Sequence, residues 1–194
     1  MRIVSTLIEL QRLKRLDRTG WTLRGLPNGT ESVAAHSFGV AVTAMLLADE
    51  IQARGAVIDT DKILRLALLH DWAESRVGDM PKTAVSYFGS EGRRKAEIAA
   101  FADVTKEAGA GSGSYRKLYD GYEARESLEA RIVKAADVID LLVQALALER
   151  GGARGLDEFW EVAEADNLPI EGMPRQVFDE LISALLEARR TLPR

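Results

Sequence analysis

Apolar residues along this chain recur mostly three and four positions apart, the spacing that places them on one face of a helix. In residues 3–16, for example, Leu7, Leu10, Leu13 and Leu16 share such a face. The same spacing predicts further helices over residues 32–54, 60 to about 78, 91–108, 122–149, 156–165 and 174–190. No convincing stretch alternates with the period of two that a strand requires. The pattern therefore predicts an all-α fold.

Glycine, proline and other turn-forming residues separate these segments. They are concentrated in residues 17–30, at Gly78-Asp79-Met80-Pro81, and in residues 109–113, which we expect to form a flexible loop. The chain of 194 residues has no internal repeat, and its length suits one domain with a sizeable hydrophobic core. We expect a compact, single-domain helical bundle that spans residues 1–194.

The composition limits which classes of function this bundle can have. A net charge of −4 does not provide the basic surface that binding of duplex nucleic acid usually needs. Without cysteine the chain cannot form disulfides or thiolate-held metal sites, which fits a reducing cytoplasm. The longest apolar run, residues 40–48, is too short to span a bilayer, and the first residues do not resemble a secretion signal. We therefore expect a soluble, cytoplasmic protein.

The two histidines of the chain, His36 and His70, both lie in apolar helical stretches. His70 is followed at once by Asp71, and burying a carboxylate without a partner costs several kcal/mol. A divalent cation would offset this cost, because it binds neutral imidazole and carboxylate together. Each residue also has a simpler interpretation, since a core histidine can be hydrogen-bonded and a His-Asp pair often arises by chance.

Three further acids could complete such a site. Glu74 follows His70 at the spacing of one helical turn, which would place both on one face, and Asp79 follows in the adjoining turn. Asp137 lies between two alanines and a Val-Ile pair, so an inward-facing carboxylate there would need a partner. Separately, Glu74 could be a solvated residue, Asp79 a turn former and Asp137 the ion-pair partner of Lys134. Together they favour a metal site with an acid–base group beside it.

The order His36, His70-Asp71 and Asp137 resembles that of the HD-domain superfamily of metal-dependent phosphohydrolases. The surrounding motifs narrow the resemblance to the HD-domain 5′-deoxynucleotidase group. These motifs are Leu13-Lys-Arg-Leu-Asp-Arg18-Thr-Gly-Trp21, Glu31-Ser-Val-Ala-Ala-His36-Ser-Phe, His70-Asp71-Trp-Ala-Glu74 and Gly78-Asp79-Met-Pro81. The family fold, the HD-domain fold, is a compact all-α bundle, in agreement with the helical pattern.

The resemblance implies a role for each candidate residue. The implied roles are metal binding by His36, His70, Asp71 and Asp137, catalysis by Glu74 and Asp79, and nucleotide binding by Arg18 and Trp21. The cofactor would be one divalent metal ion, which could be Mn, Co, Fe, Zn or Mg. Without the family, the simpler interpretation of Arg18 is a surface ion pair, and that of Trp21 is a hydrophobic lid over the bundle. Relatives are commonly dimers, so a homodimer is expected by resemblance only.

Two positions depart from the family pattern. Ala35 stands where the family usually carries an acid, directly before the first ligand histidine, so a possible contact beside the metal is lost. Gly39 stands where relatives often have Arg or Gln, and a glycine inside a helix costs about 1 kcal/mol relative to alanine. We expect these departures to affect the choice of substrate more than the metal ligands.

We therefore expect a metal-dependent phosphomonoester hydrolase, a 5′-nucleotidase that converts (deoxy)nucleoside 5′-monophosphates to nucleoside and phosphate. Its partner would be a small nucleotide rather than duplex nucleic acid or a membrane. One alternative is an HD phosphohydrolase that acts on a triphosphate, an alarmone or a cyclic nucleotide. Others are a non-catalytic sensor of metal and nucleotide, and a metal-free helical interaction module.

Overall fold

The computed structural model describes residues 3–164 and 170–192 of the chain. Within these ranges the regular elements are α-helices and short 3₁₀ helices, with a single isolated β-bridge between Asp17 and Ser32. The all-α fold expected from the sequence is therefore confirmed. The chain divides into two compact units, which we describe separately: unit 1 is residues 1–37 with 68–124, and unit 2 is residues 38–67 with 125–194.

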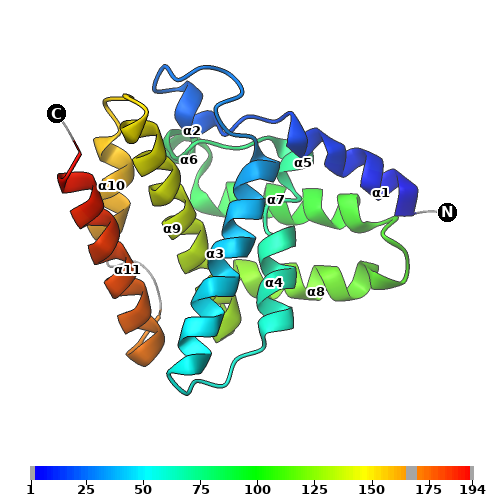
Figure 1. Cartoon of the computed structure of the whole chain (residues 1–194). Coiled ribbons are helices and arrows are strands. Elements are labelled where there is room, and N and C mark those ends of the chain that lie inside the picture. Colours follow the sequence, from blue (N-terminus) through cyan, green and yellow to red (C-terminus); the bar gives the residue numbers. More distant parts are fainter. Residues whose placement is uncertain (1–2, 165–169, 193–194) are drawn as a thin grey trace. The chain divides into compact units, whose positions relative to one another are not determined.

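The described helices follow one another along the chain as labelled in Figure 1. They are α1 (Ile3–Leu10), α2 (Thr19–Thr22), α3 (Val33–Ala53), α4 (Thr60–Leu69), α5 (Glu74–Val77), α6 (Val85–Phe88), α7 (Ser90–Thr105), α8 (Ser112–Glu123), α9 (Leu128–Arg150), α10 (Asp157–Glu164) and α11 (Gly172–Arg190). The short 3₁₀ helices are η1 (Gln11–Lys14), η2 (Lys82–Ala84) and η3 (Gly109–Gly111).

Several predicted boundaries were wrong. The flexible loop expected at residues 109–113 is instead the helix η3 followed by the start of α8, a helix that the sequence pattern did not predict. The long helix begins at Leu128 rather than at position 122, because the Ser127 side chain accepts a hydrogen bond from the backbone N–H of Ala130 and caps it. The helix expected over residues 156–165 is α10, and position 165 lies outside the described residues.

The helix expected from residue 60 to about 78 is interrupted where the candidate ligands lie. α4 ends at Leu69 and α5 begins at Glu74, and the turn between them has backbone hydrogen bonds that span three residues, such as Trp72 N–H to the Leu69 carbonyl. His70 and Asp71 therefore lie in a tight turn. The inference that His70 and Glu74 share one helical face rested on a continuous helix and was wrong on that point.

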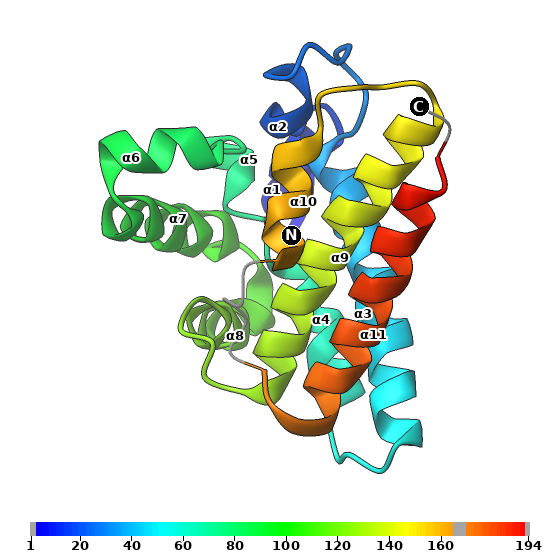
Figure 2. The ribbon, with the colours of Figure 1, turned by 90° about the vertical axis from the view of Figure 1, so that its left-hand side faces the viewer.

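Aromatic packing holds this turn in unit 1. Helices α7 and α8 run side by side in both views (Figures 1 and 2), and their Phe101 and Tyr119 rings stack with centroids 3.9 Å apart. Leu69 and Ala73, at the two ends of the turn, belong to the same buried cluster, and the Trp72 ring lies 6.2 Å from Phe101. The turn that carries His70 and Asp71 is thereby fixed on a rigid core.

In unit 2, helix α9 packs against α10 and α11, and Figure 2 shows α9 and α11 running alongside each other. Charged side chains tie one end of these three helices together. Arg189 of α11 binds Glu149 of α9 at 2.8 Å and Asp157 of α10 at 2.6 Å. Its guanidinium also lies 4.8 Å from the ring centroid of Trp160, within the range of a cation–π contact.

Among the residues that the structure describes, α3 is the one helix long and apolar enough to cross a membrane by length and composition alone. Core helices of soluble proteins pass the same test. Because α3 carries fully buried residues such as Val40, Ala44 and Ala48, the finding is weak evidence for a membrane span.

Within unit 2, Gly39 of α3 makes room for a carboxylate of α9. A Cβ atom built on Gly39 would overlap Oδ1 of Asp140 and lie only 2.8 Å from its Cγ. Real Cβ atoms do not approach other atoms this closely, so any larger residue at position 39 must displace Asp140. The close approach explains why the helix has a glycine here despite its low helix propensity.

We expect Gly39→Ala to lower the free energy of unfolding by about 1 to 3 kcal/mol, because the added methyl group overpacks the contact with Asp140. Urea unfolding measures this change. Gly92→Ala is the matched control, since Gly92 lies in α7 with nothing near its Cβ position, and it should raise stability by up to about 1 kcal/mol. Equal effects of the two substitutions would contradict the packing role of Gly39.

Candidate functional site

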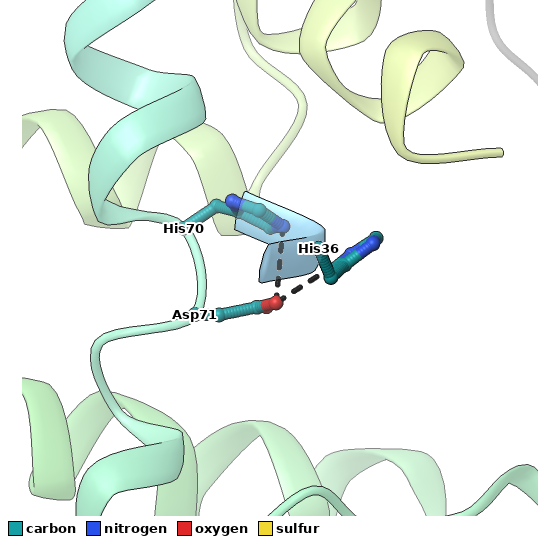
Figure 3. A group of neighbouring side chains, drawn as sticks. All are labelled: His36, His70 and Asp71. Carbon is teal, nitrogen blue, oxygen red and sulfur yellow. Dashed lines mark ion pairs between the residues drawn. The ribbon is translucent and has the colours of Figure 1, made fainter. Parts of the chain in front are cut away.

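Three of the predicted metal ligands, His36, His70 and Asp71, lie together in unit 1 (Figure 3). His36 projects from the first turn of α3, and His70 and Asp71 come from the turn after α4. In Figure 3 both imidazole rings direct a nitrogen towards the carboxylate of Asp71. Residues that are distant in the sequence thus converge as the motif order predicted.

The distances in this group suit a single divalent ion. Oδ2 of Asp71 lies 3.2 Å from Nε2 of His70 and 3.6 Å from Nε2 of His36. Two ligands bonded to one ion at about 2.0 to 2.2 Å lie roughly 3 to 3.5 Å from each other, which matches this spacing. Both histidines are buried, and Asp71 is only 14% exposed. The group therefore can hold a metal ion away from bulk solvent.

The charges around Asp71 keep its carboxyl group ionised. Burial alone would raise the pKa of Asp71, but interactions with His70, His36 and Arg18 outweigh burial and hold it well below its usual range. Its Oδ2 accepts no hydrogen bond within the described part of the chain. An ionised oxygen that is buried in this way is a suitable metal ligand.

The surroundings of Glu74 raise its pKa, whereas those of Asp71 lower the pKa of that residue. It begins α5, is 5% exposed, and its Oε2 accepts no hydrogen bond from any residue that the structure describes. Burial raises the pKa of Glu74 well above its usual value, and the carboxylates of Asp71 and Asp79 raise it further. A carboxyl group whose pKa is raised in this way, beside a candidate metal-binding group, is suited to acid–base chemistry.

The structure gives Asp79 a contact that the sequence did not predict. Its Oδ2 accepts hydrogen bonds from the backbone N–H of Thr19 at 2.6 Å and from the Thr19 hydroxyl at 2.9 Å. Asp79 thereby holds the segment that carries Arg18, whose Nη1 lies 3.9 Å from Asp79 Oδ1 and 3.8 Å from Asp71 Oδ2. Arg18 is thus part of the candidate site, and the acid–base role of Asp79 stays a prediction.

Trp21 is less accessible than its predicted role suggests. It lies in α2 and is 1% exposed, and its Nε1 donates a hydrogen bond to Oε2 of Glu31 at 2.6 Å. The residue fixes the turn-rich segment between η1 and α3. Its contact with a nucleotide stays a prediction.

The fourth predicted ligand, Asp137, lies on α9 in unit 2. Its Oδ2 accepts a hydrogen bond from Lys134 Nζ at 2.6 Å, the ion pair that was the simpler interpretation of this residue. The second carboxylate oxygen gives Asp137 further capacity to bind, because an ionised carboxylate accepts several partners. Its membership of the metal site stays a prediction.

Sequence reasoning missed one cation near these acids, Arg93. It lies in the first turn of α7, the helix that packs against α5, and its charge interacts with those of Glu74 and Asp79. The only sequence signal was its spacing of four residues from Glu97, a pattern common on exposed helix surfaces.

Comparisons with known proteins agree with the geometry. The HD-domain family matches residues 10–166, a range that includes all four predicted ligands. The chain is similar to 5′-deoxynucleotidase HDDC2 of Xenopus laevis, with 32% identity over 93% of this chain and 88% of that protein. It is similar to 5′-deoxynucleotidase YGK1 of Saccharomyces cerevisiae, with 31% identity over 77% of this chain and 69% of that protein. A solved structure of a conserved hypothetical protein from Pyrococcus furiosus aligns with a TM-score of 0.82 and 34% identity over 95% of this chain and 99% of that one.

The raised pKa of Glu74 predicts how stability depends on pH. The unfolded chain loses this proton near the ordinary glutamate value of about 4.3, whereas the folded metal-free protein retains it to higher pH. The folded state therefore binds more protons in this window, and its stability falls as the pH rises. Glu74→Gln should abolish this decline and raise stability at neutral pH by at least about 1 kcal/mol.

Urea unfolding of chelator-treated protein between about pH 4 and pH 8 tests this expectation. Glu91→Gln is the matched control, because Glu91 is 72% exposed, and it should leave the profile unchanged. Identical profiles for the wild type and Glu74→Gln would show that burial does not perturb this carboxyl group.

Proposed function

Because the chain belongs to the HD-domain family of metal-dependent phosphohydrolases, we propose that it is a 5′-nucleotidase. It hydrolyses (deoxy)nucleoside 5′-monophosphates to nucleoside and inorganic phosphate. The observation that carries the proposal is the group His36, His70 and Asp71, beside which Glu74 and Arg18 lie. The names of the curated relatives support the same substrate class.

In this proposal, one divalent metal ion would be held by His36, His70, Asp71 and Asp137. Two imidazole nitrogens and two carboxylate oxygens suit Mn, Co, Fe or Zn, and leave positions for water and substrate, whereas Mg usually prefers oxygen ligands. A single ion fits the composition, because the chain has no histidine beyond these two. Bound there, the ion supplies a Lewis acid for attack of water on a phosphate ester.

Side chains around the metal site carry out proton transfer and binding of the phosphate. Glu74 in its ionised form accepts the proton of the attacking water and then returns a proton to the departing 5′-oxygen; its raised pKa makes the carboxylate a stronger base for the first of these transfers. The guanidinium of Arg18 binds the phosphoryl oxygens, for which its planar fork is suited. Asp79 holds Thr19 and thereby keeps Arg18 in place. Trp21, on the same segment as Arg18, forms part of the wall of the proposed nucleotide-binding site.

We further propose that the protein acts in the cytoplasm on small nucleotides, as a homodimer, without duplex nucleic acid or membrane as a partner. The net charge of −4 supports the absence of nucleic acid. The proposal of a homodimer is based on the family resemblance alone.

A panel of phosphate esters tests the activity. Wild-type protein loaded with Mn or Co should release inorganic phosphate from nucleoside 5′-monophosphates, and Asp71→Ala should lose both bound metal and activity. Release of pyrophosphate or triphosphate from nucleoside triphosphates, without hydrolysis of monophosphates, would contradict the proposal.

In the same panel, Glu74→Gln separates an enzyme from a sensor. We expect it to keep the metal, measured by elemental analysis, and to lower kcat by about 10²- to 10⁴-fold, the usual contribution of a general acid–base group. Wild-type protein that binds metal and nucleotide without turnover would instead be a sensor. Wild-type protein that binds no metal would contradict the whole assignment.

Metal affinity tests the fourth ligand. Asp137→Ala should weaken binding of Mn or Co by at least about 100-fold, measured by competition with a chelator, because the ion loses a direct ligand. The matched control is Asp179→Ala on α11, whose carboxylate is 52% exposed and pairs with Arg175. If Asp137→Ala binds metal as the control does, Asp137 is an ion-pair residue and not a ligand.

A further inference from the structure

Among the described residues, the side chain of Arg93 is held by one largely buried partner, Glu97. Its Nε donates a hydrogen bond to Oε1 of Glu97 at 2.7 Å, one helical turn further along α7. The Glu97 side chain is 12% exposed and that of Arg93 is 33% exposed. By contrast, the pair Lys95–Glu91 on the same helix is more than 70% exposed on both sides. Arg93 therefore is oriented by the protein and still accessible to a small molecule.

Arg93 lies on a helix that packs beside the candidate site. α7 packs against α5, the helix that begins at Glu74. The charges of Glu74 and Asp79 stabilise the guanidinium of Arg93, and Arg93 in turn favours ionised Glu74. Across the part of the chain that the structure describes, however, the ion pair of Arg93 is with Glu97 alone. Arg93 therefore interacts electrostatically with the site acids, while its described ion pair is with Glu97.

A phosphate monoester carries up to two negative charges, so a second cationic side chain beside Arg18 would strengthen its binding at this site. The dianion must approach Asp71, Glu74 and Asp79, and Arg18 is already shared between Asp71 and Asp79. Because Nε of Arg93 is occupied by Glu97, the two terminal nitrogens of the guanidinium remain to bind oxygen atoms. A planar fork held in this way is well suited to phosphate oxygens.

We propose that Arg93 is a second phosphate-binding residue, which binds the phosphoryl group of the substrate together with Arg18, and that Glu97 is the positioning residue that orients it. The inference rests on the proposed nucleotidase function. It also predicts that the protein binds inorganic phosphate, the product, through the same side chain. Binding of phosphate can be measured without turnover.

The test measures inorganic phosphate binding to the metal-loaded protein by isothermal titration calorimetry, and hydrolysis of a deoxynucleoside 5′-monophosphate. Arg93→Ala should raise the Kd for phosphate by about 10- to 100-fold, as loss of a charge-assisted hydrogen-bonding partner does. kcat/KM should fall by a similar factor, with bound metal unchanged. Glu97→Gln should show a smaller loss, and Arg93→Lys a partial one. Arg94→Ala is the matched control, an adjacent exposed arginine that should behave as the wild type.

Unchanged phosphate affinity in Arg93→Ala would overturn the inference, as would an equal loss in Arg94→Ala, which would indicate a general effect of charge. If Arg93→Ala does not fold, Arg93→Lys and Glu97→Gln decide by the same measurement. Wild-type protein that binds phosphate through Arg93 but hydrolyses no monophosphate would refute the proposed function and support this inference. Wild-type protein that binds no phosphate would overturn the inference whatever the activity.

Discussion

The carboxylate of Asp71, held between two buried imidazoles, is the interaction on which the rest of the site depends. Removing a carboxylate from water is unfavourable, and His70, His36 and Arg18 together compensate for that loss and keep Asp71 ionised. The same negative charge, with burial, keeps the pKa of Glu74 high. One buried charge thus favours both the proposed metal ligand, Asp71, and the proposed acid–base group, Glu74. The two carboxyl groups differ in protonation because their surroundings differ, although they are only three residues apart in the sequence.

The scaffold positions these groups through one short turn. Leu69 and Ala73, which flank His70 and Asp71, are buried in the aromatic cluster formed with Phe101 and Tyr119. Because the core holds both ends of the turn, His70 and Asp71 within it have little freedom to move. The following helix α5 begins at Glu74 and packs on α7, which carries Arg93. The metal-binding group, the acid–base residue and the second arginine are therefore positioned by one continuous packing arrangement within unit 1.

The sequence predicted the long apolar helices and the convergence of His36, His70 and Asp71 well, because helical periodicity and the scarcity of histidine are strong signals. α8 was missed because glycine and serine at its start suggested a loop, although Tyr115, Tyr119 and Tyr122 have helical spacing. The bond between Asp79 and Thr19 joins residues 60 positions apart, and no local pattern encodes such a contact. Arg93 could not be distinguished from a solvent-exposed residue, since its partnership with Glu97 has the same spacing as the exposed pair Lys95–Glu91.

Arg18 lies between the carboxylates of Asp71 and Asp79. This arrangement would make binding of a metal ion and binding of a phosphate depend on each other. Before a phosphate can bind Arg18, the arginine must weaken its attraction to both carboxylates. A cation bound to Asp71 would replace Arg18 as the counter-charge of that carboxylate and would release the arginine for an anion. By thermodynamic linkage, an anion on Arg18 then strengthens cation binding by the same factor. A metal ion on Asp71 and a phosphate on Arg18 would therefore bind with positive cooperativity, and departure of the phosphate product would weaken retention of the metal.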